Sequence, residues 1–357
     1  MTPPSAIMSA KSRSPSSPFE NRKAKRYCPH GSALTTSTGS YGKIGSLIDI
    51  GSRNALHRDH CIAAFERGRH VFCEKPLAVT LSECEQIQRA HQRAGTLFAT
   101  GFVLRHAPLY KFVREQLRSG VIGKLVSFEA NEHIPPDHGG YIMRGWRRWR
   151  AQAGSHLLEK CSHDIDLLNW MTDSVPARVA SFGGRSIWTA ENKPIAEKLS
   201  RPTDNPPLYR AWPIYTDADP FLTEKDIEDH RVCIFEYRNG VRGTFHANTC
   251  AALPQRRMLF YGLEGALEAD LVTAQVRWAR IGRGEQPQTK SFKGVDMHGG
   301  ADCFIMDDLA HSMTTGAAPG ATGNEGLRSA VSCLACDLAM DEQRVVDVEP
   351  IWERLGV

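Results

Sequence analysis

The 357-residue sequence lacks several features that would assign it to a class at once. No apolar run approaches the ~20 residues that a membrane-spanning helix needs. Neither sign of charge dominates: 44 basic residues face 40 acidic ones, and a net charge of +4 is too small to argue for nucleic-acid binding. With 41% hydrophobic and 24% charged residues, the composition excludes a collagen-like or wholly disordered chain. We therefore expect a globular protein with neither a membrane nor a nucleic-acid partner.

Clustered cysteines are lacking as well. The ten cysteines are scattered, and the only close spacing joins Cys333 and Cys336 in an Ala/Leu-rich segment that is typical of a packed helix. No second pair and no nearby histidine completes a zinc set, so we expect no metal site. Scattered cysteines in a chain long enough to bury its own core are typical of reduced thiols, which predicts a cytoplasmic location.

Residues 1–46 show no apolar periodicity and are rich in Ser, Pro, Thr, Lys and Arg. We interpret them as a disordered or non-native arm. A transit peptide is an alternative, but Pro3, Pro4, Pro15 and Pro18 interrupt the amphipathic helix that it would need. A third alternative is that this stretch stands where folded sequence should be.

Residues 47–122 alternate regularly between strand and helix. Short apolar runs at 47–50, 70–73 and 97–100 predict strands, and helical patterns lie between them at 57–67 and 81–93. This βαβαβ order predicts a parallel sheet with right-handed crossovers. Ligands of such sheets bind beyond the carboxyl ends of the strands, so residues just after each strand are candidates for a site.

Residues 123–357 follow a different pattern, in which strands succeed one another closely. Predicted strands lie at 124–133, 178–187, 231–237, 241–247, 256–261, 265–271 and 275–281. Asn239-Gly240 is a strong hairpin signal, and helices are predicted at 157–171, 301–314 and 325–340, with a further helix at 108–117 before this region. The segment 188–229 contains six prolines and is expected to be a long loop. The fold class is thus α/β plus α+β: a truncated doubly wound parallel sheet, then a mostly antiparallel open sheet with helices.

Three motifs in order carry a family resemblance. They are Glu74-Lys75-Pro76 within residues 63–78, Gly101-Phe102 followed by Arg105, and the run 158–168 around His163. From about residue 47 to its end, the sequence resembles the glucose-fructose oxidoreductase/inositol dehydrogenase (Gfo/Idh/MocA) family. The resemblance implies a Rossmann domain that binds NAD or NADP and an open sheet that presents a sugar, polyol or cyclitol. It also implies a homo-oligomer that packs through this sheet.

The resemblance also implies roles for individual residues. Lys75 matches the family lysine that contacts the substrate hydroxyl and the nicotinamide ribose, His163 matches the general base, and Glu159 stands where an Asp is common. Predicted cofactor contacts are, besides Lys75, the strand-end residues Ser52, Asn54, His57 and Glu74, together with Arg105. For Arg105 two alternatives stay open: a salt bridge within the fold, or a contact with the ligand.

The chemistry of these side chains is consistent with that reading. Oxidising a secondary alcohol needs a base for the hydroxyl proton while the hydride leaves the carbon. Glu159 and His163 are four residues apart, so one helix would place both on one face, where the carboxylate could orient the imidazole. For Lys75 to share a proton near neutrality, its pKa would have to fall from about 10.4 to about 7–8 through burial and a nearby nicotinamide cation.

The phosphate-binding part of a Rossmann domain is not recognisable. At ~30 residues per βαβ unit, about 70 residues of alternating structure should precede Leu47, yet residues 1–46 contain neither alternation nor a G-x-G-x-x-G motif. Two functions follow: an NAD(P)-dependent dehydrogenase, or a degenerate, non-catalytic homologue that binds sugar or serves as an oligomer subunit. We expect the chain as written to bind NAD(P) poorly and to turn over slowly.

Overall fold

The computed structural model describes residues 46–200, 208–210, 216, 218–282, 284–293 and 298–357. The predicted arm at residues 1–46 therefore lies outside the described residues, apart from its last residue. In the described part of the chain, no helix is both long and apolar enough to cross a bilayer.

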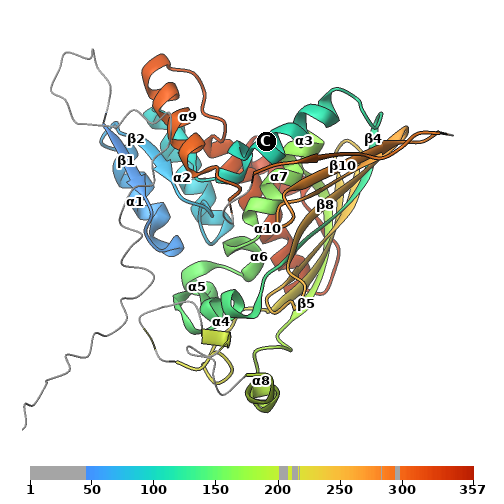
Figure 1. Ribbon diagram of the computed structural model, residues 1–357. Helices are drawn as coiled ribbons and strands as arrows, with labels where there is room; N and C mark the ends of the chain where they lie inside the picture. Colours follow the sequence, from blue (N-terminus) through green and yellow to red (C-terminus); the bar gives the residue numbers. More distant parts are fainter. Residues whose placement is uncertain (1–45, 201–207, 211–215, 217, 283, 294–297) are drawn as a thin grey trace, which may run out of the picture. The chain divides into compact units, whose positions relative to one another are not determined.

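The first sheet has three parallel strands in the order β1-β2-β3 (Figure 1). The predicted βαβαβ unit is present as β1 (Leu47–Ile50), α1 (His57–Phe65), β2 (His70–Cys73), α2 (Leu81–Ala94) and β3 (Phe98–Thr100). The Thr80 hydroxyl caps α2 by accepting from the Glu83 N–H, and α2 ends at Gly95, whose φ of +61° favours glycine. Local sequence signals are therefore sufficient to define this unit.

The second sheet has nine strands in the order β11-β10-β9-β8-β4-β7-β6-β5-β12. Its neighbours pair antiparallel except β4 and β7, which run parallel. The bounds are β4 (Leu125–His133), β5 (Pro176–Gly184), β6 (His230–Tyr237), β7 (Arg242–Asn248), β8 (Gln255–Gly262), β9 (Gly265–Asp270), β10 (Gln275–Arg280), β11 (Gln288–Ser291) and β12 (Val346–Asp347). The predicted fold class is confirmed.

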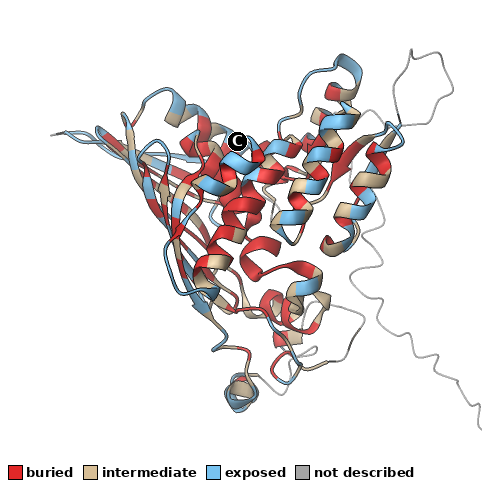
Figure 2. Cartoon of the chain, turned by 180° about the vertical axis from the view of Figure 1, so that it is seen from behind, coloured by how far each residue is buried: buried red, intermediate tan, exposed pale blue. Residues whose placement is uncertain are grey.

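Helices cover one face of this sheet. Buried and more exposed residues alternate along β6 and β7, as expected for strands with one covered and one open face. The covering helices are α3 (Pro108–Arg118), α7 (Ser162–Thr172) and α10 (Gly323–Asp341), whereas α9 (Asp302–Thr315) contacts the turn after β3. Helix α7 is buried almost all round because it packs between α10 and α3 (Figure 2). The core of this part of the chain therefore lies between the sheet and α7.

The helix predicted at 157–171 is in fact two helices, α6 (His156–Glu159) and α7, with a break at Lys160–Cys161. At the break, the Lys160 ammonium turns to the buried Glu132 carboxylate on β4, at 2.9 Å. The prediction of one continuous helix was wrong because this ion pair joins residues far apart in the sequence.

Further helices lie where none was predicted: α4 (Pro136–Arg144), α5 (Arg150–Ala153), α8 (Lys193–Leu199) and α11 (Glu349–Leu355). Helix α8 lies in the segment 188–229 that was expected to be a loop. Each of these four helices is short, and α4, α8 and α11 carry a proline in their first turn. Such short helices depend on tertiary packing and leave little periodicity in the sequence.

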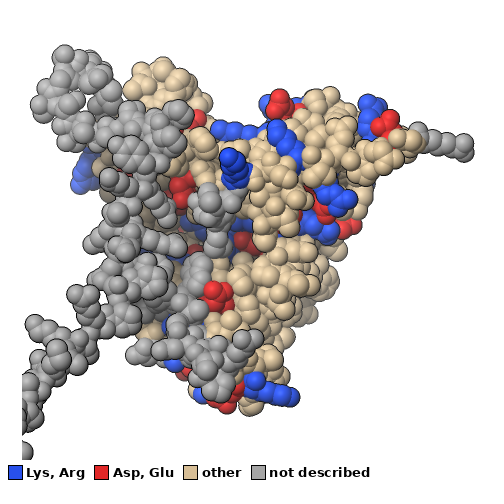
Figure 3. Space-filling model, in the orientation of Figure 1, with Lys and Arg blue, Asp and Glu red and all other residues tan. Residues whose placement is uncertain are grey.

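Eight cysteines are free thiols, and Cys333 and Cys336 lie buried in α10, as predicted for a packed helix. Cys303 is disulfide-bonded, so the expectation that all cysteines are reduced was wrong. Cys28 lies outside the described residues. On the face shown in Figure 3, acidic and basic side chains are interspersed on a larger neutral surface, consistent with the small net charge.

Candidate active site

Lys75 lies on the loop that follows β2, where its peptide bond with Pro76 is cis. Its Nζ donates a hydrogen bond to the Glu159 carbonyl oxygen, at 2.5 Å. Glu159 is the last residue of α6, so this bond joins the strand end of the parallel sheet to the helix break. Burial lowers the pKa of Lys75, although the Glu159 carboxylate opposes the change. A lowered lysine pKa is what proton transfer near neutrality requires.

The Glu159 carboxylate is held by Arg147. Arg147 Nε donates to Glu159 Oε1 at 2.6 Å, and Arg147 Nη1 donates to the Tyr141 hydroxyl at 2.7 Å. Burial by itself would raise the pKa of Glu159, but the Lys75 and Arg147 cations lower it to about 2. Glu159 is therefore ionised at neutral pH, and the carboxylate binds Arg147, whereas the sequence suggested that it would orient His163.

His163 lies in the first turn of α7 and is 4% exposed. Its ring packs edge-on against Phe102, at 6.0 Å between ring centroids, and the His298 ring lies 5.9 Å away. Burial lowers the pKa of His163 well below its ordinary value, and the nearby Lys75 and Arg256 cations lower it further. The imidazole is thus neutral at physiological pH. Among the described residues, its Nδ1 has no hydrogen-bond partner.

A network of buried charges lies beside His163. Arg256 on β8 donates two hydrogen bonds to the Asp164 carboxylate, at 2.8 and 2.7 Å. The same guanidinium lies 3.4 Å from Glu132, which also pairs with Lys160. These contacts fasten α7 and the helix break to β4 and β8, and so fix the position of the imidazole.

Ser52, Asn54 and His57, the predicted cofactor contacts after β1, make bonds that position loops. The Asn54 amide donates to the Ala153 carbonyl at 2.9 Å. The two His57 ring nitrogens lie 2.8 Å from the Pro76 carbonyl and 3.1 Å from the Ser52 carbonyl, so the ring ties the loop after β2 to the loop after β1. Contact of these residues with a cofactor stays a prediction.

Glu74 and Gly101 fit closely together at the ends of β2 and β3. A Cβ at Gly101 would lie 2.6 Å from Glu74 Oε2, so the carboxylate fills the space that a side chain would need. Glu74 Oε2 also accepts from the Lys75 N–H at 3.3 Å. Burial raises the pKa of Glu74, which the Lys75 cation opposes. The pair sets the backbone position from which Lys75 extends.

Arg105 forms a buried ion pair with Asp166 on α7, with hydrogen bonds of 2.7 and 2.8 Å. Of the two alternatives that the sequence left open, the structure contains the salt bridge. Arg105 also donates to the Gly320 carbonyl at 3.3 Å. Its predicted contact with a cofactor stays a prediction.

Sequence reasoning missed Glu132, Arg147 and His298 as parts of this site. His298 Nδ1 lies 2.8 Å from Asp302 Oδ1, which orients the ring that faces His163. These three residues come from separate elements, so only tertiary packing brings them to the site. The one local signal was the spacing of His298 and Asp302, four residues apart at the start of α9.

Two family models match the chain. Residues 43–102 match "Oxidoreductase family, NAD-binding Rossmann fold", and residues 110–268 match "GFO/IDH/MocA C-terminal domain". Together they span more than half of the sequence, in the order of the family's two domains.

The chain belongs to the Gfo/Idh/MocA family.

Relatives within this family are distant. YteT of Bacillus subtilis (strain 168) is 22% identical over 308 residues, which cover 74% of this chain and 71% of that protein. The 1,5-anhydro-D-fructose reductase of Ensifer adhaerens is 32% identical over 138 residues, 38% of this chain and 40% of that protein. The structure of a levoglucosan dehydrogenase in complex with NADH and levoglucosan superposes with a TM-score of 0.70 at 19% identity, over 85% of this chain and 80% of that chain. At that identity, the likeness shows a common fold.

Proposed function

We propose that this chain is an NAD(P)-dependent oxidoreductase that transfers a hydride between the nicotinamide and a secondary alcohol of a sugar, polyol or cyclitol. The observation that carries the proposal is the 2.5 Å bond from Lys75 to the Glu159 carbonyl, four residues before His163. This bond joins the ligand-binding end of the parallel sheet to the helix break beside a neutral, buried imidazole. Membership of an oxidoreductase family supports it.

The residues of the chain have distinct tasks in this reaction. Bound NAD(P) supplies the hydride acceptor, and Lys75 would hold the nicotinamide ribose and the reacting hydroxyl. His163 is neutral and has an unpartnered, buried Nδ1, which fits a ring that accepts the hydroxyl proton. Glu159, ionised beside Lys75 and Arg147, would orient the Lys75 ammonium through the helix end that it terminates.

The test is an assay of the purified chain with NAD+ or NADP+ at millimolar concentration against a panel of sugars, polyols and cyclitols. Removing a positioned acid–base group costs about 10²–10⁴ in rate, so Lys75→Met and His163→Ala should each lower kcat by that range. Arg89→Ala, on the exposed side of α2, is the matched control and should leave kcat unchanged. Equal activity of all variants would contradict the proposal. Sugar binding without any turnover would support the non-catalytic alternative.

The domain division also stays a proposal. We propose that residues 47–122 form a partial nucleotide-binding domain, and that residues 123–357 form the substrate and oligomerisation domain. The family matches at 43–102 and 110–268 support a boundary near that position. The cofactor is proposed as NAD or NADP, and a cytoplasmic location stays a prediction from the sequence.

We further propose a homo-oligomer that packs through the open face of the nine-stranded sheet. Phe182 on β5 pairs with Val232 on β6, and the neighbouring Ile234 points to the same face. Phe182 is 70% exposed, Ile234 48% and Val232 38%. A contiguous apolar patch of this kind is typical of an interface. The oligomeric state, measured by light scattering for the wild type and for Phe182→Glu, tests the proposal.

A further inference from the structure

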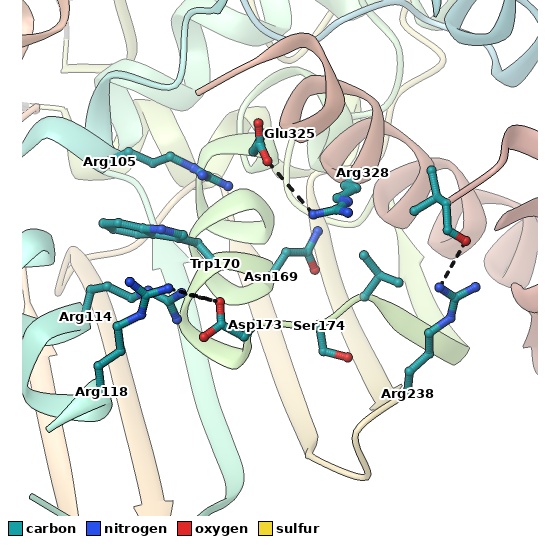
Figure 4. Close-up of a pocket in the computed structure, with 12 residues that line it drawn as sticks. Arg105, Arg114, Arg118, Asn169, Trp170, Asp173, Ser174, Arg238, Glu325 and Arg328 are labelled. Atoms are coloured by element: carbon teal, nitrogen blue, oxygen red, sulfur yellow. Dashed lines mark hydrogen bonds and ion pairs between the residues drawn. The ribbon is translucent and has the colours of Figure 1, made fainter. Parts of the chain in front are cut away.

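A pocket lies at the opposite end of α7 from His163. Its volume is about 420 Å³, and it is formed by side chains of α3, α7 and α10 together with Arg238, which follows β6 (Figure 4). Asn169 and Trp170 of α7 line it, together with Asp173, the residue that follows the C-terminus of α7. At 1.5 Å per residue, they lie about 9–15 Å along the helix axis from His163. The pocket is therefore distinct from the candidate active site.

Five arginines line this pocket, and they fall into two groups: Arg105 and Arg238, and Arg114, Arg118 and Arg328. The first two form ion pairs with carboxylates that do not line the pocket: Arg105 pairs with Asp166, and Arg238 pairs with Glu349. The other three share two lining carboxylates, those of Asp173 and Glu325.

The three arginines that share these two carboxylates are incompletely paired. Arg118 lies 3.7 Å from the Asp173 oxygen that Arg114 already contacts. Arg328 lies 4.0 Å from Glu325, whose other carboxylate oxygen accepts from the Thr322 backbone and hydroxyl in the capping box of α10. Each guanidinium has five N–H donors, so the donors that face the pocket outnumber the acceptors. The lining thus has an excess of hydrogen-bond donors over acceptors.

Arg114 gives independent evidence that the pocket is arranged to bind a ligand. Its side chain is 7% exposed, and its Nε is buried and, among the described residues, without a hydrogen-bond partner. The guanidinium centres of Arg114 and Arg105 lie 5.5 and 5.3 Å from the Trp170 ring, which keeps both cations in place by cation–π contact. An unpartnered buried donor is costly unless a ligand or water completes it.

We propose that this pocket binds a phosphate group, either free or as the ester of a small polyol or sugar. Guanidinium groups match the geometry of phosphate oxygens and form paired hydrogen bonds with them. A volume of about 420 Å³ accommodates a small phosphoester. Arg118 and Arg328 stand on α3 and α10, so a phosphate between them would be bound from two helices.

Isothermal titration calorimetry at low ionic strength tests this site with three probes: inorganic phosphate, glycerol phosphate and glycerol. The wild type should bind the two phosphates saturably and should not bind glycerol. The double variant Arg118→Glu/Arg328→Glu should bind at least tenfold more weakly; both side chains are substantially exposed, at 65% and 46%, so the fold should persist. Arg89→Glu/Arg277→Glu makes the same charge change at exposed positions on α2 and β10, and should bind like the wild type.

The possible results separate clearly. Equal affinity for both phosphates identifies the phosphate group alone as the ligand, and preference for glycerol phosphate identifies the ester; each supports the site. Absence of saturable phosphate binding by the wild type would overturn the proposal, as would equal weakening in the two double variants. Arg114→Lys keeps the charge but removes the fork, and should weaken phosphate binding in a protein that still unfolds in a single thermal transition. Full retention of affinity in Arg114→Lys would exclude Arg114 as a ligand and overturn its proposed part.

Discussion

The two sheets of this protein fix their polar groups in different ways. Around the three-stranded parallel sheet, the buried side chains Asn54, His57 and Thr100 bond to backbone carbonyls, whereas Arg105, after β3, pairs with Asp166 of α7. Between the nine-stranded sheet and its helices, the buried polar side chains include ion pairs such as Arg256–Asp164 and Lys160–Glu132. Neutral hydrogen bonds thus position the loops of the small sheet, and charge pairs anchor helices on the large one.

The difference explains how one lysine can link both regions. Lys75 extends from the neutral side into a cluster whose cations, Lys160, Arg147 and Arg256, already pair with carboxylates. Burial, together with the Lys75, Arg256 and Lys160 cations, disfavours protonation of His163. Burial together with Lys160 and Arg147 disfavours protonation of Lys75, and the Glu159 carboxylate opposes this change. The charged groups around the large sheet therefore set the electrostatic environment of the site, and the loop after β2 of the small sheet carries Lys75 into it.

The largest stability effect is expected for Arg256→Ala. The substitution would leave the Asp164 and Glu132 carboxylates buried with less compensation, and breaking a buried pair costs about 3–5 kcal/mol. Arg242→Ala removes a more exposed pair with Glu236 on the same sheet, and should cost at most about 1 kcal/mol. Urea unfolding of the two variants measures both values. Similar losses of unfolding free energy in the two variants would show that the buried charge network does not anchor the helices to the large sheet.

A smaller effect is expected from acid. Burial lowers the pKa values of His57, His156 and His163, and it lowers that of His138 to about 3. The unfolded chain binds protons at these histidines below about pH 6.5 and the folded chain does not, so stability falls as the pH falls, by about 1.4 kcal/mol per unit for each fully shifted group.

Four carboxyls oppose this change, because burial raises the pKa values of Glu74, Asp164, Asp166 and Asp337. Burial raises the pKa of Asp164 and of Asp166 to about 6, so the folded chain binds their protons first and gains stability on acidification between about pH 6 and 4. Burial also lowers the pKa values of His106, His133 and His246, so the histidines outnumber these carboxyls and the net effect of acid is a loss of stability. Thermal unfolding at pH 7, 6 and 5 should give midpoints that fall in that order. A constant midpoint would contradict the burial of neutral histidines.

Much of the fold could be predicted from the sequence because its signals are local. The strand ends before Ser52 and Glu74, and the helix end at Gly95, follow from apolar runs and turn residues close by in the chain. The candidate site was predictable only in part. The helix break after Glu159 and the pairing of Arg256 with Asp164 depend on residues about 30 to 90 positions apart, which no periodicity records. Lys75 and His163 could be predicted from the family motifs. Arg147 and Glu132 could not, because only tertiary packing brings them to the site.

The most direct test of the central claim, that the nicotinamide lies at Lys75, is a fluorescence titration of the 357-residue chain with NADH. We expect saturable binding that is weaker than micromolar, because residues 1–46 offer no recognisable phosphate loop. Losing the charged donor in Lys75→Met should weaken it about tenfold further, as one charge-assisted hydrogen bond contributes roughly 1.5–3 kcal/mol. Arg89→Met, which removes an exposed cation on α2, should leave the dissociation constant for NADH unchanged. Identical dissociation constants for the wild type and Lys75→Met would contradict the account.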